Sequence, residues 1–237
     1  MKVAFLIPSK GENWKRIEES ILYRYTLNSF IPEPDHKYIF YIGYDNGDSF
    51  YSSKNIQNKF KSKFPKFDFK FIEFPTDLGK GHLTRMWNIL FMEALTDKKH
   101  FIEYFYQCGD DILFKSKGWV QDAINYLKSH ENVGATGPRT EHPYLLTQLM
   151  VSRVHYEIFQ WFFPEYILNW GCDDWINAVY LPRHLHILKD HFCLNSGGPP
   201  RYETKNYHLR SLKQQVAAQA NMERVKLNFY LKKIHSV

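Results

Sequence analysis

Two adjacent carboxylates, Asp110 and Asp111, follow Gly109 at the end of an apolar, strand-like run at 101–108. Unpaired carboxylates are costly to bury, and a divalent cation with oxygen ligands is the usual compensation. An Asp-Asp pair after a strand can also start a helix as its N-terminal cap. The pair therefore indicates either a site for Mn²⁺ or Mg²⁺ or a capped turn.

A second acidic pair, Asp173-Asp174, stands between Trp170-Gly171 and Trp175. Flat apolar rings beside hydrogen-bond acceptors are typical of sugar-binding surfaces, and a carboxylate there can act as a general base. In the alternative interpretation, one aspartate caps a helix at 175–180 and the tryptophans belong to the core. Asp174 is the more natural cap, which favours Asp173 as the base, but both remain candidates.

Three weaker signals concern anions and metals. The run 79–82 (Gly-Lys-Gly-His) leads into a helix with Arg85 and Asn88 and is either a phosphate-binding helix start or a plain loop. His191 is either a ligand that Mn²⁺ accepts or one of many surface histidines. Arg201, after a Gly-Gly-Pro-Pro run, is a candidate phosphate clamp.

The elements that must position these residues alternate through the first half of the chain. Apolar or alternating runs predict strands, and helical spacing of apolar residues predicts helices between them. This order implies a mostly parallel, doubly wound α/β sheet with its ligand site beyond the carboxyl ends of the strands. We expect Pro8, Ser9 and Asp45 to border a nucleoside there. The predicted strands are 3–7, 38–44, 67–73 and 101–108, and the predicted helices are 14–30, 52–64 and 82–95.

The second half is less regular. We expect one domain with two halves, at about 1–115 and about 116–207, followed by a basic helical tail at about 208–237. In the tail we expect one apolar face to pack on the core, with peripheral contact to an anionic membrane as the alternative. That face comprises Leu212, Val216, Met222, Val225 and Phe229, and the basic residues around it are Lys213, Arg224, Lys226, Lys232 and Lys233. The other expected elements are a helix at 118–129, a strand at 134–137, a helical stretch at 153–180 and a strand at 185–194.

Composition narrows the class of protein. The 237 residues are 44% hydrophobic and 17% aromatic, which excludes intrinsic disorder. Three widely spaced cysteines predict neither a disulfide framework nor a cysteine zinc site. The apolar run at 3–7 is too short for a signal peptide, and we expect a cytoplasmic protein. The net charge of +6 suits a nucleotide diphosphate, a nucleic acid or an acidic membrane surface.

Taken together, these residues resemble a nucleotide-sugar glycosyltransferase of the GT-A fold, over nearly the whole chain apart from the tail. The strand end at Gly109-Asp110-Asp111 resembles that family's Asp-x-Asp motif, which holds Mn²⁺ or Mg²⁺ against the donor diphosphate. The segment 169–174 resembles the Trp-Gly-Trp-Gly-Gly-Glu-Asp-Asp stretch of inverting β-1,4-galactosyltransferase-like enzymes. The segment 188–191, followed by Asn195, resembles their later metal-binding histidine segment.

The resemblance implies transfer of a sugar from a nucleotide diphosphate sugar, with UDP preferred, to an acceptor hydroxyl with inversion. It also implies that the half at about 1–115 binds the nucleotide sugar and that the half at about 116–207 binds the acceptor. Asp111 would be the direct metal ligand. Asp110 would serve as a second ligand or contact ribose or a metal-bound water, because adjacent strand residues face opposite ways. His191 would complete the metal site, and Asp173 or Asp174 would take the acceptor proton.

Two other functions fit parts of the sequence. A metal-dependent nucleotidyltransferase would share the nucleotide fold and the acidic pair, but its Gly-rich amino-terminal loop is absent from the sequence, since 8–11 contains one glycine. A basic protein that binds nucleic acid or a membrane surface would use the lysines of 54–66 and the tail. We expect no nucleic acid in the main cleft, because the acidic pairs would repel it.

Overall fold

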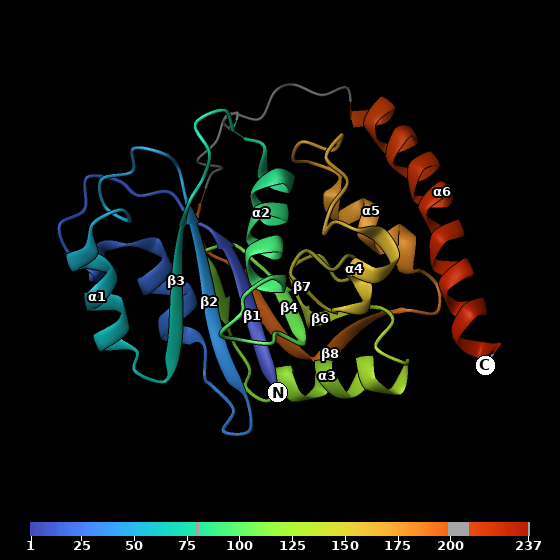
Figure 1. The fold of residues 1–237 in the computed structure, drawn as a ribbon, viewed down its shortest axis with the longest axis horizontal. Helices are drawn as coiled ribbons and strands as arrows, with labels where there is room; N and C mark the ends of the chain where they lie inside the picture. The colour runs from blue at the N-terminus through green and yellow to red at the C-terminus, as the bar shows by residue number, and fades with distance from the viewer. Residues whose placement is uncertain (79–80, 199–208, 237) are drawn as a thin grey trace.

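The computed structural model describes residues 1–78, 81–198 and 209–236. Its strands form one sheet in the order β3-β2-β1-β4-β7-β6-β8-β5, with helices on both faces (Figure 1). The expected α/β sheet is confirmed. The strands are β1 (Lys2–Pro8), β2 (Lys37–Tyr44), β3 (Phe67–Glu73), β4 (Tyr104–Gln107), β5 (Ile112–Phe114), β6 (Ala135–Arg139), β7 (Leu149–Ser152) and β8 (Leu185–Asn195).

Strand β1 shows why the sheet is buried on both sides. It pairs in parallel with β2 on one side and with β4 on the other. Val3, Phe5 and Ile7 point into one hydrophobic core, whereas Ala4 and Leu6 point into the other, as the two-residue period of a strand requires. A strand that is buried on both faces needs apolar residues at every position, which explains the continuous apolar run at 3–7.

The helices divide between these two cores. Helices α1 (Lys54–Lys63) and α3 (Trp119–Ser129) contribute to the core that contains Phe5. The opposite core receives α2 (Leu83–Leu95), α4 (Val154–Phe159), α5 (Cys172–Tyr180) and α6 (Leu209–His235). The amino terminus lies at the end of the sheet opposite the strand ends that carry Pro8 and Asp110 (Figure 1).

The sheet is less uniform beyond β4. Strand β7 runs antiparallel to both β4 and β6, β8 runs parallel to β6, and β5 closes the order antiparallel to β8. Strands β5 and β7 were not predicted from the sequence, because strands of three and four residues show almost no alternation. The helical stretch expected at 153–180 is in fact two helices, α4 and α5, separated by a loop.

One expected helix takes a different form. In place of a regular helix at 14–30, the chain forms a 3₁₀ helix, η1 (Ile17–Glu19), and a π-helical segment, η2 (Tyr23–Leu27). The hydroxyl of Thr26 accepts a hydrogen bond from the Ile112 amide at 3.1 Å, so this segment is shaped by its contact with the strand end after β4. Such π-helical turns are frequent at functional sites.

The tail forms α6 but does not bury the expected face. Val216 is buried, whereas Met222, Val225 and Phe229 are exposed, so the expected core packing of one common face is wrong. Val216 and Val225 are nine positions apart, which at about 100° per residue places them on opposite sides of the helix. Within the ranges the structure describes, no helix combines the length and the apolarity needed to cross a bilayer.

Candidate active site at the carboxyl end of the sheet

Asp110 is a buried carboxylate fixed from two neighbouring segments. Its Oδ2 lies 2.5 Å from the hydroxyl of Ser9, the residue that follows β1. The Ser9 hydroxyl also lies 2.8 Å from the hydroxyl of Tyr51, and all three side chains are buried. Since a serine hydroxyl has one proton, Ser9 donates to the carboxylate and accepts from Tyr51. The end of β1 and the end of β4 are thereby joined through a polar network.

Asp111 lies in a space that only glycines leave open. A Cβ atom on Gly109 would stand 2.4 Å from Asp111 Oδ1, and a Cβ atom on Gly197 would stand 2.1 Å from Oδ2. The Asp111 carbonyl accepts a hydrogen bond from the Ser196 amide at 2.9 Å. The loop after β8 is therefore packed directly against this carboxylate, and larger residues at these two positions would displace it.

Side chains from distant segments hold the backbone around the acidic pair. The Thr26 hydroxyl donates to the Gly109 carbonyl at 3.3 Å, and the Gln148 side-chain oxygen accepts from the Gly109 amide at 3.1 Å. The Ser29 hydroxyl accepts from the Phe114 amide at 2.9 Å. The chain after β4 therefore turns into β5 under restraints from Thr26 in η2, from Ser29 and from Gln148, the residue before β7.

The donor set suits a hard divalent cation. Asp110 and Asp111 supply carboxylate oxygens, and the absence of side chains at Gly109 and Gly197 leaves room for the Asp111 carboxylate itself. Among the described residues no group of three or more His, Cys, Asp and Glu side chains gathers around one point. Mg²⁺ is commonly held by one or two carboxylates, with water and substrate phosphates completing its coordination. The residues present fit that mode and do not form a cage made of protein ligands alone.

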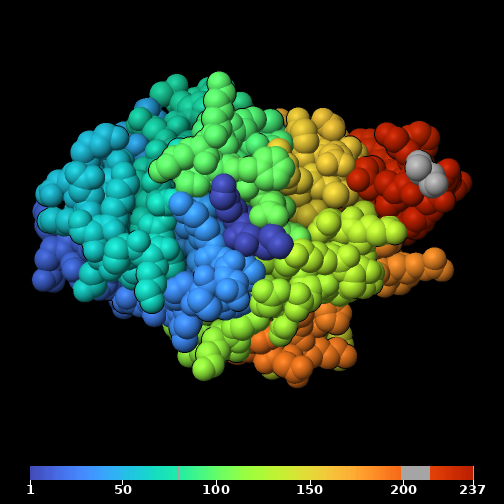
Figure 2. All heavy atoms as spheres, turned by 60° about the horizontal axis from the view of Figure 1, so that its bottom comes forward, coloured from blue at the N-terminus to red at the C-terminus, as the bar shows by residue number. Residues whose placement is uncertain are grey.

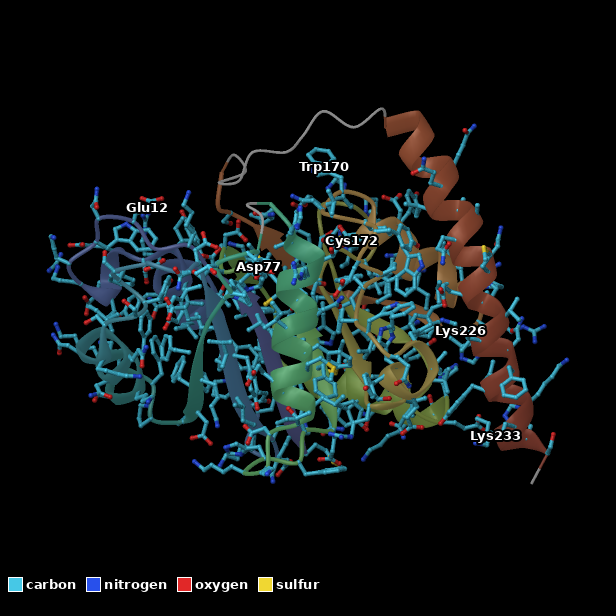
Figure 3. All side chains as sticks on the ribbon, turned by 45° about the horizontal axis from the view of Figure 1, so that its top comes forward. Glu12, Asp77, Trp170, Cys172, Lys226 and Lys233 are labelled. Carbon is cyan, nitrogen blue, oxygen red and sulfur yellow. The ribbon has the colours of Figure 1, made fainter. Side chains whose placement is uncertain are left out.

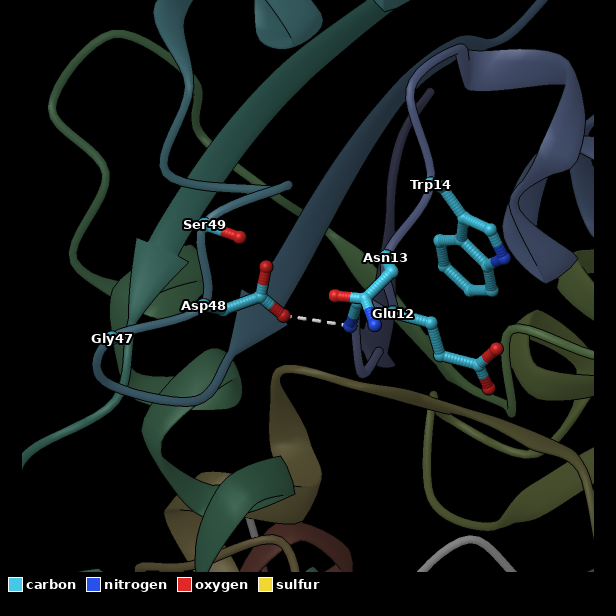
Figure 4. A pocket seen from close by; sticks show the side chains of 7 residues that line it. Glu12, Asn13, Trp14, Gly47, Asp48 and Ser49 are labelled. Atoms are coloured by element: carbon cyan, nitrogen blue, oxygen red, sulfur yellow. Dashed lines mark hydrogen bonds between the residues drawn. The ribbon is translucent and has the colours of Figure 1, made fainter.

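A polar cavity of about 540 Å³ lies between the loops that follow β1 and β2 (Figure 4). Asp48 joins these loops, since its Oδ2 accepts from the Gly11 amide at 2.6 Å and its Oδ1 accepts from the Tyr51 amide at 2.9 Å. A Cβ atom on Gly11 would stand 2.5 Å from Asp48. The cavity is lined by Gly11, Glu12, Asn13, Trp14, Gly47, Asp48 and Ser49.

The structure brings most of the residues expected at the nucleoside together. Pro8 pairs with Gly43 on β2, and the Ser9 amide donates to the Gly43 carbonyl at 2.7 Å. Asp45 stands two residues beyond Gly43 in the loop that leads into the cavity. Pro8, Ser9 and Asp45 thus share one edge of the sheet with Asp110.

Asp173 is partly buried in the first turn of α5. The helix starts at Cys172, with Gly171 at its N-cap, so neither aspartate is the N-cap residue and the expected capping by Asp174 is wrong. Burial, and secondarily the charge of Asp174, raises the pKa of Asp173 to about 7. Asp174 is exposed. A carboxyl whose pKa is near neutral can both hold and release a proton under ordinary conditions.

The two tryptophans beside this pair have different roles. Trp175 is fully buried in the core, so the expectation that both rings form a sugar-binding face is wrong for Trp175. Trp170 is 48% exposed and keeps its ring available at the surface. In Figure 3, Trp170 and Cys172 lie on the same side of the molecule as Glu12 and Asp77. Trp170 and Cys172 therefore share that side with Glu12 in the loop after β1.

Two residues expected at the donor have other contacts. Asn88 is buried, its side-chain oxygen accepts from the Phe162 and Phe163 amides, and its nitrogen donates to the Phe163 carbonyl at 2.8 Å. These bonds hold the loop after α4, so Asn88 is turned toward the interior and away from any donor. Arg85 is partly exposed and lies 3.5 Å from Asp77 in an ion pair.

The structure does not bring His191 to the acidic pair. Its Nε2 lies 2.8 Å from Asp122 Oδ2 on α3. His191 is four positions along β8 from Asn195, the partner of Ile112, and four strand residues span roughly 13 Å. We therefore leave His191 out of the proposed metal site. Arg201 lies outside the described residues.

Sequence reasoning missed Tyr51 and the anchoring role of Asp48. Asp48 accepts from the amides two and three residues further on, Phe50 and Tyr51, at 2.9 Å each. This is the local pattern by which an aspartate starts a helical turn, and it was visible in Asp48-Ser49-Phe50-Tyr51. The contact of Tyr51 with Ser9 joins residues 42 positions apart, and no local pattern reveals it.

Comparison with known proteins identifies the fold. No family model and no curated protein matches the sequence. Solved structures do match, and three of them are each 12% identical to this chain. S. aureus TarS, residues 1–349, aligns over 95% of this chain and 70% of its own length with a TM-score of 0.55. The mannosyltransferase PcManGT from Pyrobaculum calidifontis, in complex with GDP-Man and Mn²⁺, aligns over 99% of this chain and 75% of its own length with a TM-score of 0.55.

GalNAc-T7, solved with UDP, GalNAc and Mn²⁺, aligns over 91% of this chain and 47% of its own length with a TM-score of 0.60. These structures are GT-A glycosyltransferases, and the chain described here has the same mixed α/β fold. The GT-A-like fold expected from the sequence is confirmed. The likeness to inverting β-1,4-galactosyltransferase-like enzymes stays a prediction.

Proposed function

We propose that the protein is a glycosyltransferase that moves a sugar from a nucleotide diphosphate sugar to an acceptor hydroxyl. The observation that carries this proposal is the strand end after β4, where Asp110 is anchored by Ser9 and Asp111 lies between two glycines. In an open α/β sheet, ligands bind beyond the carboxyl ends of the strands. The shared fold with glycosyltransferases supports the same assignment.

The donor would bind along this edge. Asp111, with Asp110 beside it, would hold Mn²⁺ or Mg²⁺, which when bound compensates the negative charge of a diphosphate. Pro8, Ser9 and Asp45 would border the nucleoside, and the cavity beside Trp14 offers it space and an aromatic face. We favour UDP as the nucleotide, with GDP as the alternative, since the similar structures contain one or the other.

The acceptor would bind near α5. Asp173, whose pKa is raised to about 7, would take the proton from the acceptor hydroxyl as that oxygen attacks the anomeric carbon. Asp174 is the alternative base. One base without a protein nucleophile gives inversion at the anomeric carbon, and the exposed Trp170 would offer its ring to a sugar.

A hydrolysis screen tests the proposed function. The protein is incubated with UDP- and GDP-sugars in the presence of Mn²⁺, and free sugar and nucleotide diphosphate are quantified by NMR. We expect slow release of sugar from at least one donor, with loss of that activity in Asp111→Asn. Asp35→Asn, which removes an exposed carboxylate before the first residue of β2, at the other end of the sheet, is the matched control. No release from any donor, or release that Asp111→Asn leaves unchanged, would contradict the proposal.

A further inference from the structure

Helix α6 has an apolar face that no described residue covers. Met222, Val225 and Phe229 are 66%, 67% and 73% exposed and follow one another at intervals of three and four residues, which places them on one side of the helix. The opposite side carries Val216 and Leu227, both buried against the domain. The helix therefore needs only one of its two apolar faces to remain attached to the fold.

The charges around this face have one sign. The sequence from 209 to 237 contains a single carboxylate, Glu223. That side chain is buried on the inner face, with Lys226 Nζ at 2.8 Å. Lys232 and Lys233 are exposed, and no ion pair of either is found in the described part of the chain. Figure 3 shows Lys226 and Lys233 along α6, away from Glu12 and Asp77. The outward side of α6 thus combines apolar side chains with uncompensated positive charge.

A basic cavity adjoins the same end of the helix. It measures about 740 Å³, and Lys232 lines it together with His130, Arg183, His184 and His235. One carboxylate lies beside the cavity: Glu131 Oε2 is 2.9 Å from His235 Nε2. Figure 2 shows the residues of α6 at the right-hand margin of the molecule. The cavity therefore places the Arg183 guanidinium beside Lys232 at this end of the helix.

We infer that the outward face of α6 docks on a lipid bilayer that contains anionic lipids. Such a surface offers an apolar layer for Met222, Val225 and Phe229 and negative headgroups for Lys232 and Lys233. A second copy of the chain is a poorer occupant, because it would present the same face, in which α6 provides no exposed carboxylate to meet the lysines. The inference is independent of the proposed function.

Vesicle sedimentation tests this inference with the full chain. Vesicles of phosphatidylcholine alone are compared with vesicles that also contain phosphatidylserine, at low and high salt. We expect binding to the anionic vesicles that weakens with salt. Because each lysine near such a surface contributes roughly fivefold in partitioning, Lys232→Gln with Lys233→Gln should reduce it about 25-fold. Phe229→Ser should reduce it about 10-fold through lost apolar contact.

Matched controls separate this surface from general charge and hydrophobicity. Lys61→Gln with Lys63→Gln removes two exposed lysines from α1, and Phe101→Ser removes a phenyl ring that is 66% exposed elsewhere. Both controls should bind vesicles as the wild type does. Absence of vesicle binding, equal binding to neutral and anionic vesicles, or equal losses in the controls would overturn the inference. A dimer in light scattering that Phe229→Ser abolishes, without vesicle binding, would assign the face to a second copy.

Discussion

Replacement of Asp173 by Asn tests whether this carboxylate is the catalytic base or has no role in catalysis. Burial raises the pKa of Asp173 from 3.8 to about 7. Between these values the folded state holds a proton that the unfolded state has released, so the free energy of unfolding falls as pH rises through this window. The shift corresponds to about 4 kcal/mol at most, since partial exposure screens the charge.

Asp173→Asn introduces a neutral amide that mimics the protonated acid. It therefore removes the free-energy cost of ionising this carboxyl in the folded state. We expect the variant to match the wild type in urea unfolding at about pH 3.5, below the ordinary pKa of the carboxyl, and to be more stable at pH 8.5, by up to about 4 kcal/mol. Turnover should fall by about 10² to 10⁴, the usual contribution of a general base, while donor binding is retained. The wild-type rate should decline as pH falls below about 7.

Asp174→Asn is the matched control, because it removes an exposed carboxylate from the same helical turn. The charge of Asp174 contributes to the raised pKa of Asp173, so its removal should move the acid limb of the rate profile to lower pH. If Asp173→Asn transfers sugar at the wild-type rate and Asp174→Asn does not, the roles are reversed. If neither variant slows transfer, the proposed base and the inverting mechanism are both refuted.

The remaining predictions concern the strand end that would bind the donor, and two residues, Asn88 and His191, that the structure places away from it. Ser9→Ala should destabilise the fold by about 1 to 3 kcal/mol in urea unfolding, because the buried Asp110 loses its hydroxyl donor; an unchanged midpoint would contradict that role. Gly197→Ala should abolish Mn²⁺-dependent nucleotide binding in calorimetry, because its Cβ would meet the Asp111 carboxylate; wild-type affinity would count against the site. Asn88→Ala should cost about 2 to 4 kcal/mol of stability while nucleotide affinity at low temperature is retained, and the reverse pattern would return Asn88 to the donor. His191→Ala should leave Mn²⁺-dependent binding within about twofold, whereas a tenfold loss, about 1.4 kcal/mol, would restore it as a ligand.

The sequence alone predicted the helices and strands whose apolar residues follow a clear pattern. The buried run of β1, the alternation in β3 and the helical spacing in α2 each reflect the environment of that segment alone. The same local logic placed Asp110 and Asp111 at a strand end, and parallel order then placed them beside Ser9. The position of the acidic pair was therefore predictable before any contact was known.

Residues whose environment depends on distant partners were not predictable in this way. Asn88 looked like a polar residue facing a donor, but its partners at Phe162 and Phe163 lie about 75 positions away and turn it inward. His191 fitted a sequence resemblance, yet its place along β8 separates it from Asp111. The raised pKa of Asp173 arises mainly from burial in the folded chain, which no local sequence pattern reveals.

Isothermal titration of UDP and GDP in the presence and absence of Mn²⁺ tests the central claim most directly, with Asp111→Asn as the comparison. If the strand end after β4 holds a cation against a nucleotide diphosphate, at least one of the two should bind only when Mn²⁺ is present, and Asp111→Asn should lose that binding while remaining folded. Binding that is independent of both Mn²⁺ and Asp111, or no binding of either nucleotide, would contradict the account.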